Sequence, residues 1–147
     1  MEPTAALSHR ANTRWRVVGG LDAVTGRVVW RGGGKVGVAV LKRFLVDLRA
    51  AYPGRVLAVV WDNWPVHFHP EVLAEAKRQR IALYRLPTYA PWLNPIEKLW
   101  RWLKQERLHH HRQADAWDAL KTGLGTWLDG FAHGSDDLLR YVGLLPK

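Results

Sequence analysis

The sequence contains no cysteine, and this absence excludes several kinds of chemistry. A disulfide framework, a thiolate metal site and a cysteine nucleophile are all ruled out. No run of about 18 apolar residues is present, so no segment is expected to cross a membrane as a helix. The first ten residues lack an apolar stretch and do not read as a signal peptide. We therefore expect a cytoplasmic protein without a membrane partner.

The length and composition favour one basic domain. The 147 residues suffice for a single domain, and the hydrophobic fraction of 48% suffices for a packed core. Lysine and arginine number 22 against 13 aspartate and glutamate residues, which gives a formal net charge of +9. Such a charge favours a polyanionic partner, with nucleic acid as the first candidate. The nine tryptophans are explained most simply as core or interface residues.

The spacing of apolar residues predicts a hairpin followed by alternating helices and strands. Residues 1–13 are small and polar, without periodicity, and are expected to be a disordered N-terminal segment preceding a domain at 14–147. Strands are expected at 14–23, 27–31, 55–61 and 81–86, and helices at 36–51, 70–80, 94–112, 114–128 and 136–144. This order predicts a layered α/β domain whose mixed sheet combines an antiparallel hairpin with parallel strands and is flanked by helices.

Asp62 follows the carboxyl end of a predicted strand, which is where sheets of this kind form their binding sites. The run at 55–61 is short, apolar and bounded by turn residues, so it reads as a buried strand. Asp62 and Asn63 follow its carboxyl end directly, and His67 comes five residues after the aspartate. A carboxylate in this position is suited to holding a cation. The alternative interpretation is ordinary turn chemistry for Asp62–Asn63 and a structural hydrogen bond for His67.

Glu97 has two interpretations as well. Asn94 suits the N-cap of a helix, Pro95 suits its first position, and Glu97 falls where a glutamate reaches back to the cap. Helix capping alone therefore explains Glu97. The same turn could also direct its carboxylate toward Asp62, and two carboxylates from separate elements form the hard oxygen set that Mg²⁺ prefers.

The predicted helix that follows is strongly basic. Its positive residues are expected on an exposed face, opposite an apolar stripe. They form either a strip that contacts phosphates or simply a solvated face. The residues concerned are Lys98, Arg101, Lys104, Arg107 and Arg112.

A glycine-rich stretch at 32–35 offers a weaker hypothesis of nucleotide binding. It lies between a predicted strand and a predicted helix, as a phosphate-binding loop would. It lacks the required spacing between glycines, and Val36 stands where a serine or threonine would bind Mg²⁺. We interpret the stretch as a flexible connection.

Taken together, these motifs resemble a known family. The segment VVWDN at 59–63 with His67, followed by LPTYAPWLNPIEKLW at 86–100 and Leu103–Lys104, resembles the catalytic core of DDE transposases. The bacterial insertion-sequence branch of the mariner-like superfamily is the most similar. Ala90 replaces the serine usual in that motif, and 34 residues separate Asp62 from Glu97, as is typical of the branch. The similarity spans about residues 14–112, including the hairpin at 19–26.

The resemblance implies a ribonuclease-H-like fold and DNA strand cleavage and transfer in transposition. It implies two Mg²⁺ or Mn²⁺ ions, which activate water or a DNA 3′-hydroxyl and stabilise the leaving oxygen. Asp62 corresponds to the second metal-binding carboxylate and Glu97 to the third, so both are the expected catalytic residues. Asn63 and His67 correspond to accessory groups beside the site.

The resemblance also implies which partners the protein has. Lys98, Arg101, Lys104 and Arg107 are expected to face DNA, both transposon ends and target. A protein that acts on DNA in this way would associate with the nucleoid when bound.

One part of the family pattern has no match. The first aspartate of the family lies on a strand before the hairpin, whereas Glu2 and Asp22 are the acidic residues that precede Asp47 here. Glu2 lies in the segment expected to be disordered, and Asp22 matches a hairpin residue. We therefore expect a partial domain that lacks the first strand, with impaired activity. The alternatives are a non-catalytic nucleic-acid-binding remnant and a fragment completed by a second polypeptide, such as an N-terminal fragment that supplies the first aspartate. The expected protein partners are that fragment or a second copy in a homodimer.

Overall fold

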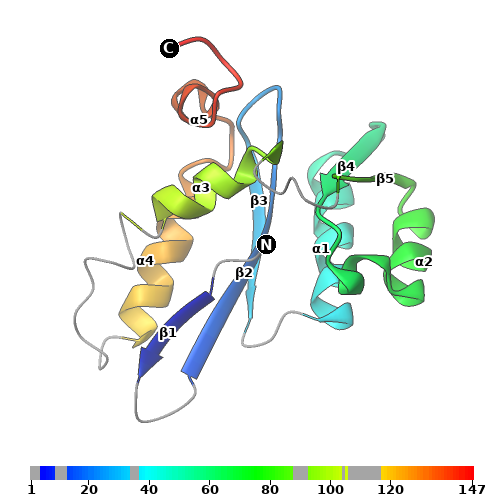
Figure 1. Cartoon of the computed structure of the whole chain (residues 1–147), viewed down its shortest axis with the longest axis horizontal. Helices are drawn as coiled ribbons and strands as arrows, with labels where there is room; N and C mark the ends of the chain where they lie inside the picture. Colours follow the sequence, from blue (N-terminus) through cyan, green and yellow to red (C-terminus); the bar gives the residue numbers. More distant parts are fainter. Residues whose placement is uncertain (1–3, 9–12, 34–36, 88–92, 104, 106–116) are drawn as a thin grey trace.

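The computed structural model describes residues 4–8, 13–33, 37–87, 93–103, 105 and 117–147 (Figure 1). Helices and strands alternate after an N-terminal group of strands, as the apolar spacing predicts. No helix in the described ranges is both long and apolar enough to span a bilayer. The elements are β1 (Thr4–Ser8), β2 (Thr13–Leu21), β3 (Val28–Gly33), α1 (Val38–Ala51), β4 (Leu57–Trp61), η1 (Pro65–Phe68), α2 (Pro70–Arg78), β5 (Ile81–Arg85), α3 (Ile96–Leu103), α4 (Trp117–Asp129) and α5 (Asp136–Tyr141).

The strands form two sheets rather than one mixed sheet. The first is antiparallel in the order β1-β2-β3, and β2 pairs with β3 from Arg16 opposite Gly33 to Leu21 opposite Val28. The second is the parallel pair β4-β5, in register from Leu57 opposite Ile81 to Trp61 opposite Arg85. The hairpin and the parallel pair are thus both present as predicted, and the described strands do not connect them.

The N-terminal segment differs from the expectation. Residues 1–13 were expected to lack regular structure, but Thr4–Ser8 forms β1, which pairs antiparallel with the beginning of β2. The pairing is irregular between Ala6 and Ser8. The polar composition predicted disorder because it signals no buried face. The free backbone groups along an edge of β2 accept a short partner strand regardless of its side chains.

Strand β2 separates two hydrophobic cores. Successive strand residues point to opposite faces, so Val17 joins one core and Val18 the other. The first core lies against α3, α4 and α5, and it contains Leu99, Leu128 and Leu138 among its buried residues. The second core contains the apolar face of α1 together with residues of β4, α2 and β5. Helix α1 thus packs against both the hairpin and the elements around the parallel pair.

The β2–β3 turn is fixed by Asp22. Its Oδ1 accepts the backbone N–H groups of Val24 (2.8 Å) and Thr25 (3.1 Å), and its Oδ2 accepts the Tyr52 hydroxyl (2.8 Å). Gly26 has a positive φ of 76°, and a β-carbon there would collide with the backbone at Ser135. The turn is therefore attached both to the end of α1 and to the segment that precedes α5.

Packing at Leu99 yields a stability prediction. Leu99 is fully buried in the first core, whereas Leu73 on α2 is 42% exposed. We expect Leu99→Ala to lower the free energy of unfolding by about 2–5 kcal/mol, since it removes buried methylenes and leaves a cavity. Leu73→Ala serves as the control and should cost less than about 1 kcal/mol. Urea unfolding followed by tryptophan fluorescence measures both, and equal losses would contradict this description of the core.

Candidate active site

Asp62 lies directly beyond the carboxyl end of β4 in a tight turn. Its Oδ1 accepts the backbone N–H of Trp64 at 3.0 Å, and its side chain is 18% exposed. His67 Nδ1 lies 3.1 Å from the same Oδ1 and 3.2 Å from the Asp62 carbonyl oxygen. The hydrogen-bonded turn that the sequence offered as an alternative explanation of Asp62–Asn63 is therefore present. It holds the carboxylate in one place without burying it completely.

His67 is a buried ring that supports Asp62. It is 7% exposed, and the Trp61 ring stacks on it with centroids 4.3 Å apart and planes 6° apart. Trp64 contacts the same ring edge-on at 5.3 Å. Burial lowers the pKa of His67, although its contacts with Asp62 act in the opposite direction. The ring is therefore neutral at neutral pH. Because both atoms near Nδ1 are acceptors, Nδ1 carries the proton and donates to Asp62.

Glu97 lies in the first turn of α3. The Asn94 side chain accepts the Ile96 N–H at 3.3 Å, and its carbonyl accepts the Glu97 N–H at 3.1 Å, so the predicted cap at Asn94 is present. Trp100 sets the position of the helix against β2, because a β-carbon at Gly19 would lie 2.5 Å from the Trp100 ring. Only glycine admits this close approach of α3 to β2.

The predicted site residues meet at one cavity. A space of about 1160 Å³, here called the inter-sheet cavity, is lined by 16–21 of β2 and 57–61 of β4. Asp62, Asn63, His67 and Glu97 also line it. All four residues predicted as catalytic or accessory therefore border the same cavity. Within the described part of the chain, no group of three or more acidic or histidine side chains is arranged to hold a metal ion.

The four predicted DNA-contacting residues are only partly described. Lys98 and Arg101 are exposed on α3, as the amphipathic pattern predicts. Lys104 and Arg107 lie outside the described residues. The glycine-rich stretch has a different place from a phosphate loop: Gly32 and Gly33 lie in β3, paired with Val17 and Arg16.

Two polar atoms in the cavity wall were not anticipated from the sequence. Arg16 Nε and Trp61 Nε1 are buried, and neither has a hydrogen-bond partner among the described residues. Both residues line the inter-sheet cavity. No sequence signal marks them, because their common environment arises only when β2 and β4 come together. Buried donors of this kind are normally satisfied, so their state calls for an explanation.

A family model described as DDE superfamily endonuclease matches residues 2–121. The chain belongs to the DDE superfamily endonucleases. Its matches include an uncharacterized 39 kDa protein of insertion element IS630 from Shigella sonnei, 28% identical over 112 residues. That match covers 75% of this chain and 33% of the relative, so the chain spans about a third of that relative's length.

Solved structures confirm the fold of this DDE superfamily domain. The Mos1 transposase catalytic domain, solved with raltegravir and Mg, has a TM-score of 0.72 at 18% identity and matches 99% of this chain and 76% of its own. The Mos1 mariner paired end complex with Mn has a TM-score of 0.62 at 18% identity, and the match covers 95% of this chain and 43% of that one. A chain of a simian T-cell lymphotropic virus intasome has a TM-score of 0.55 at 17% identity, and the match covers 85% of this chain and 46% of that one. The predicted ribonuclease-H-like α/β fold is therefore confirmed.

Tyr52 at the cavity wall yields a pH prediction. Burial, followed by its hydrogen bond to Asp22, raises the pKa of Tyr52 to about 12, above the value of about 10 in an unfolded chain. The stabilisation by the neutral phenol is complete below pH 10 and is lost as the pH rises through 12. We expect the urea midpoint of the natural protein to fall more steeply over this range than that of Tyr52→Phe. Tyr84→Phe, at an exposed tyrosine, should fall as steeply as the natural protein; identical slopes for all three would contradict the assignment.

Proposed function

We propose that residues 14–147 are a partial DDE transposase catalytic domain whose chemistry is metal-dependent cleavage and joining of DNA strands. The observation that supports the proposal is that Asp62 and Glu97 both line one cavity, which the residues of β4 also line. These two carboxylates would hold a divalent cation, Mg²⁺ or Mn²⁺, because such ions prefer hard oxygen ligands. The family membership and the metals named in the Mos1 structures support the same assignment.

The donor set fits such an ion in part. Asp62 is held by the Trp64 N–H and by His67, which fix its carboxylate at the cavity wall. A bound ion of this kind activates an attacking hydroxyl and stabilises the leaving oxygen of a phosphodiester. The resemblance implies three carboxylates, but Asp22, the other described acidic residue that lines the cavity, uses its oxygens in the β2–β3 turn, and the described residues offer no metal-holding group of three. We therefore expect weak metal binding and impaired cleavage by this chain alone.

The accessory residues act on Asp62 rather than on DNA. His67 donates to the carboxylate and to the carbonyl of Asp62, which fixes the direction of the side chain. Its stacking with Trp61 keeps the ring from turning. Asn63 follows Asp62 directly in the same turn and lines the same cavity. In this proposal His67 and Asn63 are positioning groups, while Asp62 and Glu97 are the ligands.

DNA is the proposed partner, and the exposed basic face of α3 is its proposed contact. Lys98 and Arg101 project from the helix that carries Glu97, so phosphates bound by them would lie near the two carboxylates. The net charge of +9 favours the same partner. A non-catalytic DNA-binding remnant is the second candidate, and it is favoured because the described residues contain no group of three or more side chains arranged to hold a metal ion. The two candidates differ in metal binding, which is the first test.

Metal binding can be measured with Mn²⁺ alone. Asp62→Asn and Glu97→Gln should each weaken Mn²⁺ affinity by about tenfold or more, because each removes a charged ligand. The control is Glu71→Gln, which changes an exposed glutamate on α2 and should leave affinity unaltered. Electron paramagnetic resonance of free Mn²⁺ gives the affinities. If Asp62→Asn and Glu97→Gln bind Mn²⁺ as the natural protein does, the metal assignment is wrong. Any nicking of supercoiled plasmid should be lost in the same two variants.

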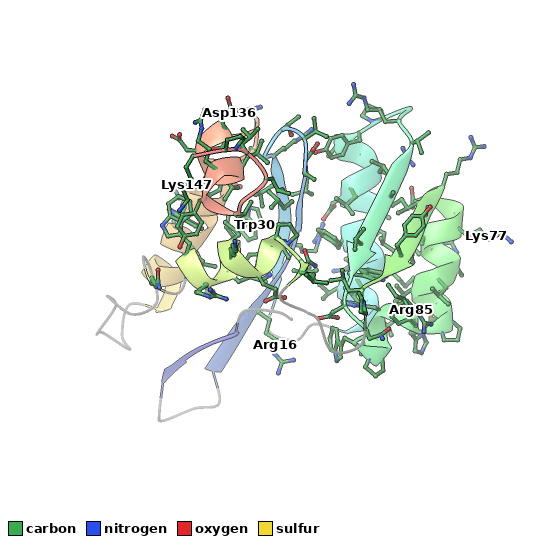
Figure 2. All side chains as sticks on the ribbon, turned by 45° about the horizontal axis from the view of Figure 1, so that its top comes forward. Arg16, Trp30, Lys77, Arg85, Asp136 and Lys147 are labelled. Atoms are coloured by element: carbon green, nitrogen blue, oxygen red, sulfur yellow. The ribbon has the colours of Figure 1, made fainter. Side chains whose placement is uncertain are left out.

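DNA contact can be measured through its dependence on salt. Each phosphate contact contributes about 0.9 to the slope of log affinity against log salt concentration. Lys98→Ala and Arg101→Ala should each reduce that slope by about 1 and weaken binding similarly across sequences. Lys77→Ala, on the far side of α2 in Figure 2, should leave the slope unchanged. A fluorescence anisotropy titration at several salt concentrations gives the slopes. A slope insensitive to Lys98 and Arg101 but sensitive to Lys77 would place the DNA elsewhere.

A further inference from the structure

Helix α5 holds a tyrosine, Tyr141, in a fixed position on its last turn. Leu138 and Leu139 of the same helix are fully buried and anchor it to the domain. Gly143 then takes a positive φ of 86°, and the Leu144 N–H donates to the Leu139 carbonyl at 2.8 Å, which ends the helix in a defined way. Tyr141 nevertheless remains 41% exposed. Its ring is therefore both held in place and accessible.

The Tyr141 ring lies on a group of aromatic side chains. It stacks on Trp102 of α3, with ring centroids 4.4 Å apart and planes 25° apart. Trp102 in turn contacts Trp127 edge-on at 5.2 Å and lies 6.1 Å from the Phe131 ring. All three of these supporting side chains pack against the first core and are only partly exposed. Tyr141 is thus the most exposed ring of a stack that the core supports from below.

Positive side chains of α3 border the same stack. Lys98 and Trp102 are four residues apart on α3 and therefore lie on the same side of the helix. A β-carbon at Gly143 would lie 3.4 Å from Lys98 Nζ, so the ammonium group lies beside the end of α5. Arg101, the residue before Trp102, is exposed as well. Figures 1 and 2 both show α5 next to α3. An exposed aromatic ring and cations thus share one surface.

This combination has the chemistry of a nucleic-acid contact. A single exposed tyrosine needs no explanation, but a ring supported by a core and placed beside cations can bind a base and its phosphate together. Stacking of this kind tolerates any sequence, because every base has a π-face. Trp102 covers one face of the Tyr141 ring, so a base can stack only on the opposite face. Bases inside a duplex are stacked on both faces by their neighbours, so the base concerned must be unpaired.

We infer that Tyr141, with Lys98 beside it, binds an unpaired nucleobase of a DNA strand and an adjoining phosphate. The inference rests on the proposed function, in which DNA is the partner, and it adds the class of DNA: a strand with a single-stranded segment. Trp102 lies five residues after Glu97, which is about 7.5 Å along α3 at about 1.5 Å per residue. The bound segment would therefore lie on the helix that carries Glu97.

The probes are two labelled DNA strands, used with the full chain and without metal. One is a thymidine strand of about twelve nucleotides, and the other has the same backbone with abasic residues in its central part. Both present the same phosphates, so the ratio of their affinities measures the contribution of the bases. We expect the natural protein to bind the thymidine strand about tenfold more tightly, as measured by fluorescence anisotropy.

Variants of Tyr141 assign this preference to the ring. Tyr141→Leu keeps an apolar contact with Trp102 but removes the π-face, so the preference for bases should fall about tenfold, while the salt slope stays unchanged. Tyr141→Phe keeps the ring and should keep the preference. Tyr84→Leu is the control, because Tyr84 is a tyrosine of β5 that is 57% exposed. Thermal midpoints verify that the variants fold, and the comparison of the two strands on the natural protein needs no variant.

Three results would overturn the inference. The first is equal binding of the two strands by the natural protein, and the second is an unchanged preference in Tyr141→Leu. The third is equal binding of both strands together with self-association that Tyr141→Leu abolishes, which would show that the ring packs against a second copy. Equal binding that Lys98→Ala weakens refutes the stack and leaves the proposed DNA partner standing. Absence of binding to either strand refutes the DNA partner and the stack together.

Discussion

The packing of α1 holds the two sheets in one domain, since the described strands do not join them. Leu41, Phe44, Leu45 and Leu48 form one buried face, which contacts Val18 of the hairpin together with β4, α2 and β5. Each such side chain contributes about 1.5–3 kcal/mol through burial. Hydrogen bonds at the C-terminal end of α1 connect it to both sides. Arg27 of the hairpin donates to the Ala51 carbonyl, and Arg49 of α1 donates to the carbonyls of Gln79 and Arg80, which precede β5. The relative placement of β2 and β4 follows from these contacts.

The candidate site depends on that placement, because its residues come from separate elements. Asp62 is fixed locally by Trp64 and His67, while Glu97 arrives on α3 through the contact of Trp100 with Gly19. Capping and turn chemistry are compatible with the proposed function. A hydrogen bond in the turn after β4 holds the Asp62 carboxylate, and the hydrogen bonds at the start of α3 fix the backbone of Glu97. Both side chains line the same cavity.

The sequence predicts the local parts of this arrangement well. Apolar spacing identifies α1, and the run before Asp62 identifies β4, because both patterns reflect burial by their own neighbours. Two features could not be predicted from the sequence. Strand β1 forms on backbone pairing with β2, for which its side chains carry no signal. The Arg16 and Trp61 donors become unsatisfied only after distant segments meet. Long-range backbone pairing leaves no pattern in a single segment.

The opening between the sheets links stability to chemistry. The buried donors of Arg16 and Trp61 represent hydrogen bonds that the described chain does not make, each with a desolvation cost of about 1–3 kcal/mol. Asp62 and Glu97 line the same cavity as these donors, so whatever fills it changes the dielectric and the charge around both carboxylates.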